Sequence, residues 1–304
     1  MGGLRITPGL IRQRVLSNLH NQEARVLDLQ EQLSTGLRVN RPSDNPVDAR
    51  RAINAQTSIQ KNDQYVRNIS SAGPQLEETV TVIQNVANSL QRARTLTLQG
   101  ANGTNSADQR TALAAEINQL LEGLLTSANH QTNGKYIFSG SKTLTPAYNA
   151  TRNVSGEITA VTYQGNDSHY QITTGDGATS TINQTGQETF QSSQDVFQTL
   201  IAIRDNLRAG DTNSLQNARL TELSTIQSQL SNAVARVGAV QNRLANVSSD
   251  LDTFTVQYRQ LLSDSVDADF ADTMVNLNAQ QNAYQAALNA ASRVVQQSLL
   301  DYLR

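Results

Sequence analysis

Residues 223–261 read LSTIQSQLSNAVARVGAVQNRLANVSSDLDTFTVQYRQL. Apolar residues recur there at alternating spacings of three and four, the pattern of helices that pack side by side. At 1.5 Å per residue the predicted helix is about 57 Å long, so it needs packing partners along its whole length. The seam consists of Leu223, Ile226, Leu230, Ala233, Val237, Val240, Leu244, Val247, Leu251, Phe254, Tyr258 and Leu261.

Candidate partners for this helix lie upstream in the sequence. Residues 47–72, 75–100 and 107–130 each carry apolar residues at helical spacing, which predicts three amphipathic helices. Pro74 separates the first two and predicts either a kink or the start of a new helix. Ser106 or its neighbour is placed to cap the third.

Both ends of the chain are also predicted to be helical. Their apolar seams are interrupted by polar residues, so these helices are weak alone and depend on packing in a shared bundle. The N-terminal seam contains Leu19, Val26, Leu29 and Leu33, and the C-terminal seam contains Leu277, Tyr284 and Leu288.

The segment from 136 to 190 differs from the rest of the chain. Short runs rich in β-branched and aromatic residues, at 136–138, 158–163 and 170–173, alternate with glycine-containing turns. This pattern predicts a small β-rich domain inserted between helices.

Composition excludes several classes of protein. The net charge of -2 provides no basic field for nucleic acid, and the absence of cysteine removes disulfides, thiolate metal sites and cysteine nucleophiles. No nucleotide-binding, hydrolase or metalloprotease motif is found. The N-terminus lacks the apolar core of a secretory signal, and no apolar run is long enough to span a membrane. We therefore expect no enzyme activity, cofactor or metal.

Two loops carry a family resemblance. Ser34-Thr35-Gly36-Leu37-Arg38-Val39-Asn40 resembles a signature of the flagellin-like family of flagellar axial proteins. The continuation Arg41-Pro42-Ser43-Asp44-Asn45-Pro46, and the segment Asn133-Gly134-Lys135-Tyr136-Ile137-Phe138-Ser139-Gly140, resemble the branch of that family that joins hook to filament.

Two further segments are similar to flagellins and to that branch alike. They are Leu90–Arg94 with the turn Gln99–Thr104, and Asp267-Ala268-Asp269-Phe270-Ala271-Asp272. The acidic cluster of the second lacks the central glycine and the final glutamate of a calcium loop, so acids near a helix start are the simpler interpretation. The resemblance covers residues 1–140 and 215–304.

The resemblance implies a mainly α fold: an elongated flagellin-like helical rod with paired terminal helices and a small β-rich inserted domain. We expect a terminal helix and loop at 1–45, the first half of the rod at 46–135 and the insert at 136–190. The second half of the rod would occupy 191–264, and a terminal helix 265–304.

The function implied is that of a structural subunit exported without a cleaved signal peptide to the extracellular flagellum. Expected partners are further copies of the chain, a neighbouring hook-associated protein, flagellin-type subunits and an export chaperone at the C-terminal helix, with no nucleic acid or membrane. The expected interface residues are Leu19, Val26, Leu29, Leu33, Arg38, Asn40, Arg41, Asp44, Arg92, Arg94, Asp267, Asp269, Phe270, Leu277, Tyr284 and Leu288.

Two alternatives stay open. A flagellin would share the same physics and form the filament itself, although the 41–46 and 136–140 segments disfavour it. A constitutive coiled-coil signalling or chaperone protein would explain the 223–261 seam, but not the terminal motifs.

Overall fold

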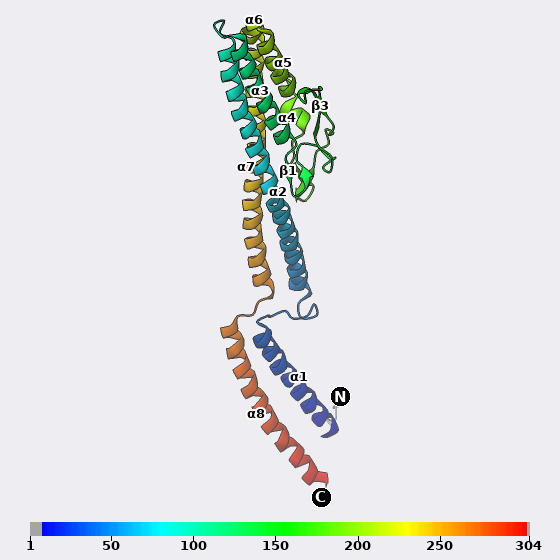
Figure 1. The fold of residues 1–304 in the computed structure, drawn as a ribbon. Helices are drawn as coiled ribbons and strands as arrows, with labels where there is room; N and C mark the ends of the chain where they lie inside the picture. The colour runs from blue at the N-terminus through cyan, green and yellow to red at the C-terminus, as the bar shows by residue number, and fades with distance from the viewer. Residues whose placement is uncertain (1–7, 303–304) are drawn as a thin grey trace. The chain divides into compact units, whose positions relative to one another are not determined.

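The computed structural model describes residues 8–302, with side chains described for 9–292 apart from Ile11. The fold is mainly helical, as predicted, and the described part of the chain begins and ends in a helix (Figure 1). The helices are α1 (Pro8–Thr35), α2 (Pro46–Gly100), α3 (Ala107–Ala128), α4 (Gly186–Phe190), α5 (Val196–Ala209), α6 (Thr212–Ser214), a π-helical turn (Leu215–Arg219), α7 (Leu220–Val266) and α8 (Phe270–Tyr302). None of the described helices is long and apolar enough to cross a membrane.

The predicted β structure lies between α3 and α4 as three antiparallel pairs. They are β1 (Gln131–Thr132) with β2 (Lys135–Tyr136), β3 (Tyr148–Arg152) with β4 (Ile158–Tyr163), and β5 (Gln171–Gly175) with β6 (Ala178–Thr181). Each pair is a hairpin, because its two strands are consecutive in the chain.

Helix α2 runs through Pro74 without a break, so the alternative of a new helix start at this proline is wrong. Proline removes one backbone hydrogen bond and crowds the preceding turn. Ala72 and Leu76, on either side of it, are buried at 0% and 2% exposure, and this packing outweighs the local cost. The third helix begins as predicted, with Ser106 and Gln109 forming a reciprocal capping box.

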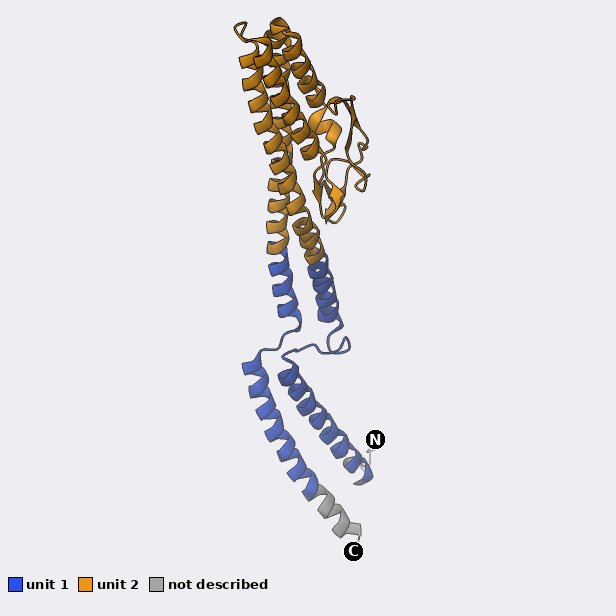
Figure 2. Cartoon of the chain, in the orientation of Figure 1, with its two compact units in different colours: residues 1–61, 253–304 blue, residues 62–252 orange. Residues whose placement is uncertain are grey.

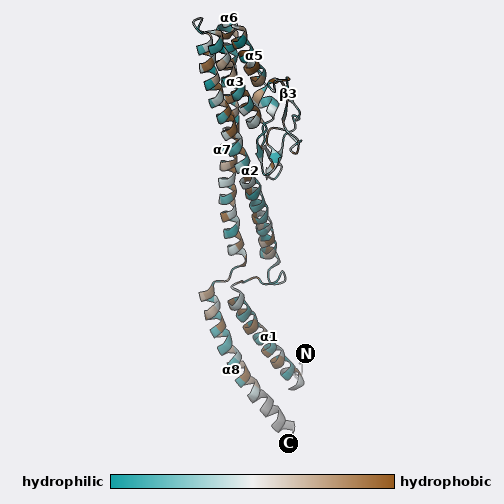
Figure 3. Ribbon diagram, viewed as in Figure 1, coloured by the Kyte–Doolittle hydropathy of each residue, from teal (hydrophilic) through white to brown (hydrophobic). Residues whose placement is uncertain are grey.

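The chain divides into two compact units (Figure 2). Unit 1 comprises residues 1–61 and 253–304, and unit 2 comprises residues 62–252. The core of unit 2 joins the helices to the insert through an aromatic cluster, in which the Tyr148 ring lies 4.7 Å from that of Phe197 and 6.0 Å from that of Phe190. Hydrophobic residues recur along the helices of this unit (Figure 3), and those that are buried form a continuous cluster.

The predicted seam of α7 holds for ten of its twelve positions. Phe254 and Leu261 are 49% and 45% exposed, and Thr255 is buried instead. A strict seven-residue repeat drifts by about 20° per heptad on a straight α-helix, which adds up to about 100° between Leu223 and Leu261. One residue along a helix also turns about 100°, so the buried face passes from Phe254 to its neighbour.

Unit 1 has almost no core of its own. Its buried apolar residues, among those described, are Val39, Ala55 and Ala291, all small or medium in size. Helix α1 packs along α8, and no large side chain described on either helix is buried between them. Little apolar burial therefore stabilises this pair within a single chain.

Candidate assembly surface

The loop after α1 crosses the junction between α7 and α8. Leu37 and Asp267 form an isolated antiparallel bridge, the Arg38 amide donates to the Val266 carbonyl over 2.7 Å, and the Ala268 amide donates to Gly36 over 2.9 Å. Gly36 has φ +72°, which ends α1 and turns the chain toward this crossing. Two motifs at opposite ends of the sequence thus meet.

Arg38 secures this crossing with its side chain. Its guanidinium donates to the Ser265 carbonyl over 2.8 Å and to the Asp48 carboxylate over 3.0 Å. Arg41 instead pairs with Glu31 on α1, at 3.2 Å. The arginines of this loop therefore pair with carboxylates other than Asp267 and Asp269.

Asn40 and Asp44 fix the shape of the loop itself. The Asp44 carboxylate accepts hydrogen bonds from the backbone amides of Asn40 and Arg41, at 3.1 and 2.7 Å. The Asn40 side chain donates to the Leu37 carbonyl over 3.0 Å. The adjacent Asn45 caps α2 by accepting from the amides of residues 47 and 48. This segment is thus a structured turn between two helices.

The acidic motif opens α8. The Asp269 carboxylate accepts from the amides of Ala271 and Asp272 at 2.9 and 3.1 Å, as an N-cap does. Asp267 accepts a hydrogen bond from the Ser263 hydroxyl at the end of α7. No cluster of potential metal ligands is found among the described residues. Phe270 follows with 64% of its surface exposed.

The predicted seams of the terminal helices are only partly covered. Leu19, Val26, Leu29 and Leu33 on α1 are half-buried, as are Leu277 and Tyr284 on α8. Leu288 is 43% exposed. The helix pair therefore leaves much of its apolar surface in contact with solvent.

Many large apolar side chains of unit 1 are exposed to solvent. Twelve of the sixteen large apolar side chains that are exposed among the described residues belong to this unit. We call them the terminal apolar surface: Leu10, Leu16, Leu27, Val47, Ile53, Phe254, Val256, Leu261, Phe270, Met274, Val275 and Leu288. Sequence reasoning missed most of them, because they fall outside the periodic seams.

Arg92 and Arg94 belong to α2 within unit 2, whereas the other predicted interface residues belong to unit 1. Both are exposed. The Arg92 guanidinium lies 2.6 Å from the Glu116 carboxylate, and the pKa of Arg92 is raised mainly by that hydrogen bond. Arg92 thus pairs with a carboxylate on the neighbouring helix α3.

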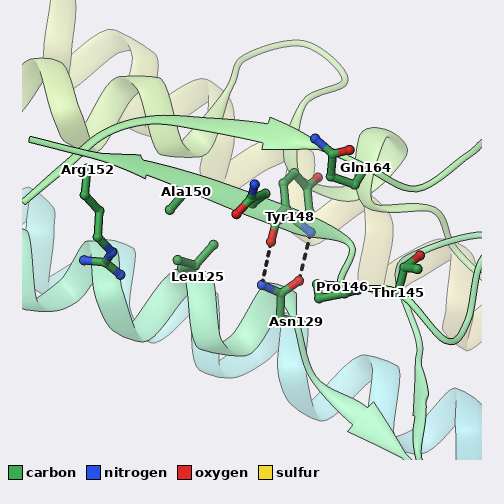
Figure 4. Close-up of a pocket in the computed structure, with 9 residues that line it drawn as sticks. Leu125, Asn129, Thr145, Pro146, Tyr148, Ala150, Arg152 and Gln164 are labelled. Atoms are coloured by element: carbon green, nitrogen blue, oxygen red, sulfur yellow. Dashed lines mark hydrogen bonds between the residues drawn. The ribbon is translucent and has the colours of Figure 1, made fainter.

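Unit 2 contains cavities beside the insert. One, of about 540 Å³, lies between α3 and β3 (Figure 4). There the side chain of Asn129 makes two hydrogen bonds, at 2.8 and 2.9 Å, with the backbone of Tyr148. Arg152 at its edge pairs with Glu122. These contacts attach the insert to α3. The second cavity, of about 420 Å³, lies between α2 and the insert.

Comparison with known proteins places this architecture in a family. Residues 10–143 match the model of the bacterial flagellin N-terminal helical region, and residues 220–303 match that of the C-terminal helical region. The two models together cover more than half of the chain and leave most of the insert between them.

Individual relatives give a finer resemblance. Flagellar hook-associated protein 3 of Escherichia coli is 28% identical over 94% of this chain and 96% of its own length. The Salmonella typhimurium protein of the same name is 32% identical, over 62% of this chain and 57% of its own length. Flagellin of Salmonella muenchen is also 32% identical, but matches over only 26% of its length.

A solved structure has the same fold. The flagellar junction protein FlgL from Legionella pneumophila superposes with a TM-score of 0.61 over 71% of this chain and all of its own, at 16% identity. The chain therefore belongs to the bacterial flagellin family and, within it, resembles flagellar hook-associated protein 3 over nearly its whole length.

Proposed function

We propose that this chain is a structural subunit of the bacterial flagellum that joins the hook to the filament. The observation that carries the proposal is the terminal apolar surface, on a unit that has almost no core. The resemblance to hook-associated protein 3 along most of the chain supports a junction role over a role in the bulk filament.

Unit 1 has little buried apolar surface among its described residues. Removing apolar surface from water is favourable by roughly 25 cal/mol per Å². Among the described side chains of α1 and α8, only Thr273 and Ala291 are buried in the single chain, so most of that free energy is not gained. Contact between copies of the unit would gain it. Association therefore completes the folding of this pair.

Its neighbours follow from this role. We expect other copies of the chain in a ring, a hook-associated protein on one side and flagellin-type subunits on the other. An export chaperone would cover the apolar face of α8 before assembly. The protein would act outside the cell, after export without a cleaved signal, and would catalyse no reaction. The predicted interface residues, from Leu19 to Leu288, stay predictions of this role.

The proposal is tested by adding the purified full-length chain to isolated hooks. A junction subunit stays monomeric alone, binds the hook end that carries its neighbour, and then allows added flagellin to polymerise there. Long filaments formed by the chain alone would favour the flagellin alternative. A stable dimer without any hook binding would favour the coiled-coil alternative.

Surface variants locate the interface. Phe270→Ser and Val275→Ser change residues that are 64% and 67% exposed on α8, so the monomer should remain folded while hook binding is lost. Leu144→Ser is the matched control, because this residue is 81% exposed but lies in the insert. Equal hook binding by all three variants would contradict an interface on the terminal unit.

A further inference from the structure

The cavity between α2 and the insert has the features of a small-molecule site. Its walls come from α2, from the first hairpin with the loop after it, from the start of β5 and from Ile182 at the end of β6. Its volume of about 420 Å³ falls within the range of ligand pockets in proteins. Because these segments are far apart in the sequence, the cavity exists only in the folded chain.

The first hairpin gives the cavity a fixed wall. Asn133 and Gly134 have φ angles of +53° and +74°, as a two-residue turn of this type requires. The turn sets Thr132 opposite Lys135 in the strand register. Tyr136 is held by its amide, which donates to the Thr143 carbonyl over 2.8 Å. The wall is therefore formed before any ligand arrives.

The cavity combines aromatic walls with accessible polar groups. Tyr136 and Tyr170 line it together with Ile137 and Ile172. Thr132 Oγ1 is buried there without a hydrogen-bond partner. Asn133 and Lys135 are exposed and Gln75 is half-buried, so their polar groups face solvent at the cavity and are accessible to a ligand.

The charge and polarity of the lining residues exclude several classes of ligand. Lys135 is its one charged residue and no carboxylate is present, so a cation is disfavoured. A purely apolar ligand would bury the amides without compensating hydrogen bonds, which costs free energy. A phosphate is usually held by several cationic or backbone donors. A neutral or singly acidic ligand with many hydroxyl groups and one apolar face satisfies all of these constraints.

We propose that this cavity binds one saccharide unit. The C–H face of the sugar ring lies against Tyr136 and Tyr170, whose rings supply apolar area. The Tyr170 hydroxyl donates to the Ser141 carbonyl over 3.3 Å, which holds this ring in place. The hydroxyls of the sugar bond to Gln75, Asn133 and Lys135. The other cavity suits this role less well, because its Asn129 and Arg152 are already engaged with protein groups.

The test is a titration of the full-length chain, labelled at its isoleucine methyl groups, with glucose, galactose, N-acetylglucosamine and galacturonic acid. Binding should shift the methyl signals of Ile137, Ile172 and Ile182, which line the cavity. The signals of Ile83 and Ile117, buried in the helical core, should not move. If no sugar of this panel shifts the three cavity signals, the proposal is wrong.

Variants decide where the sugar binds. Tyr136→Ala and Lys135→Ala should each weaken binding by about tenfold, the effect of losing one aromatic contact or one charge-assisted hydrogen bond. Lys142→Ala is the control, because this lysine is also in the insert but donates to the Gln164 carbonyl, outside the cavity. Unchanged Ile83 and Ile117 signals show that each variant is folded. Undiminished binding by both test variants would overturn the assignment.

Discussion

The guanidinium of Arg38 donates a hydrogen bond to the carbonyl oxygen of Ser265 over 2.8 Å, across a separation of 227 residues in the sequence. The same guanidinium reaches Asp48 on α2. One side chain therefore connects the loop after α1 with the start of α2 and the end of α7. All three segments belong to unit 1.

Arg38→Ala should loosen this crossing. The lost bond is charge-assisted, but the Arg38 side chain is 44% exposed, so we expect a cost of about 1 kcal/mol. Amide hydrogen exchange measures it: the Ala268 amide, which bonds to the Gly36 carbonyl, should exchange several-fold faster. Arg50→Ala, an exposed arginine of the same unit, is the control. Equal exchange in both variants would show that Arg38 does not hold the crossing.

The two faces of α7 should respond differently to substitution. Leu230 is 1% exposed, so Leu230→Ala should destabilise the chain by about 2–5 kcal/mol through loss of burial and a cavity. Phe254→Ser, at an exposed position of the same apolar repeat, should change stability by less than about 0.5 kcal/mol. Denaturant unfolding compares them. A large loss of unfolding free energy in the Phe254→Ser variant would mean that the buried face of α7 does not shift to Thr255.

Two helical glycines should give opposite results when changed to alanine. A Cβ at Gly100 would lie 2.0 Å from Leu207 Cδ2, a fully buried side chain, so Gly100→Ala should destabilise by about 1–3 kcal/mol. Nothing lies within 4 Å of a Cβ at Gly123, inside the C-terminal half of α3. Gly123→Ala should therefore stabilise by about 0.5–1 kcal/mol. Thermal unfolding of both variants tests this contrast. A change of unfolding temperature in the same direction for both variants would refute it.

The link between Glu157 and Arg208 should give acid-sensitive stability. The hydrogen bond between the Glu157 carboxylate and the Arg208 guanidinium lowers the pKa of Glu157 from 4.5 to about 2. A carboxyl group with a depressed folded-state pKa stabilises the fold above its unfolded pKa, and this contribution is lost as the pH falls from 4.5 toward 2. Glu157→Gln should therefore unfold at a lower temperature than the unchanged chain at pH 7, and the difference should shrink across that window. Glu77→Gln, an exposed carboxyl on α2, is the control.

Local sequence signals determined most of the secondary structure. Capping residues such as Ser106 and Asp269 start helices through bonds to amides two or three positions away, so the sequence predicts them directly. Helical spacing likewise identified the seam of α7 up to Leu251, because apolar residues three and four positions apart lie on the same face of a helix.

Only the tertiary structure decided the features that depend on accumulated geometry or on distant segments. The small angular drift of each heptad adds up along α7, so that Phe254 points to solvent and Thr255 is buried. The buried packing of Ala72 and Leu76 keeps α2 continuous through Pro74. The meeting of Leu37 with Asp267, and the cavity beside Tyr136, join parts of the chain that share no local periodicity. Sequence patterns record local preferences, whereas such contacts arise only when all elements pack at once.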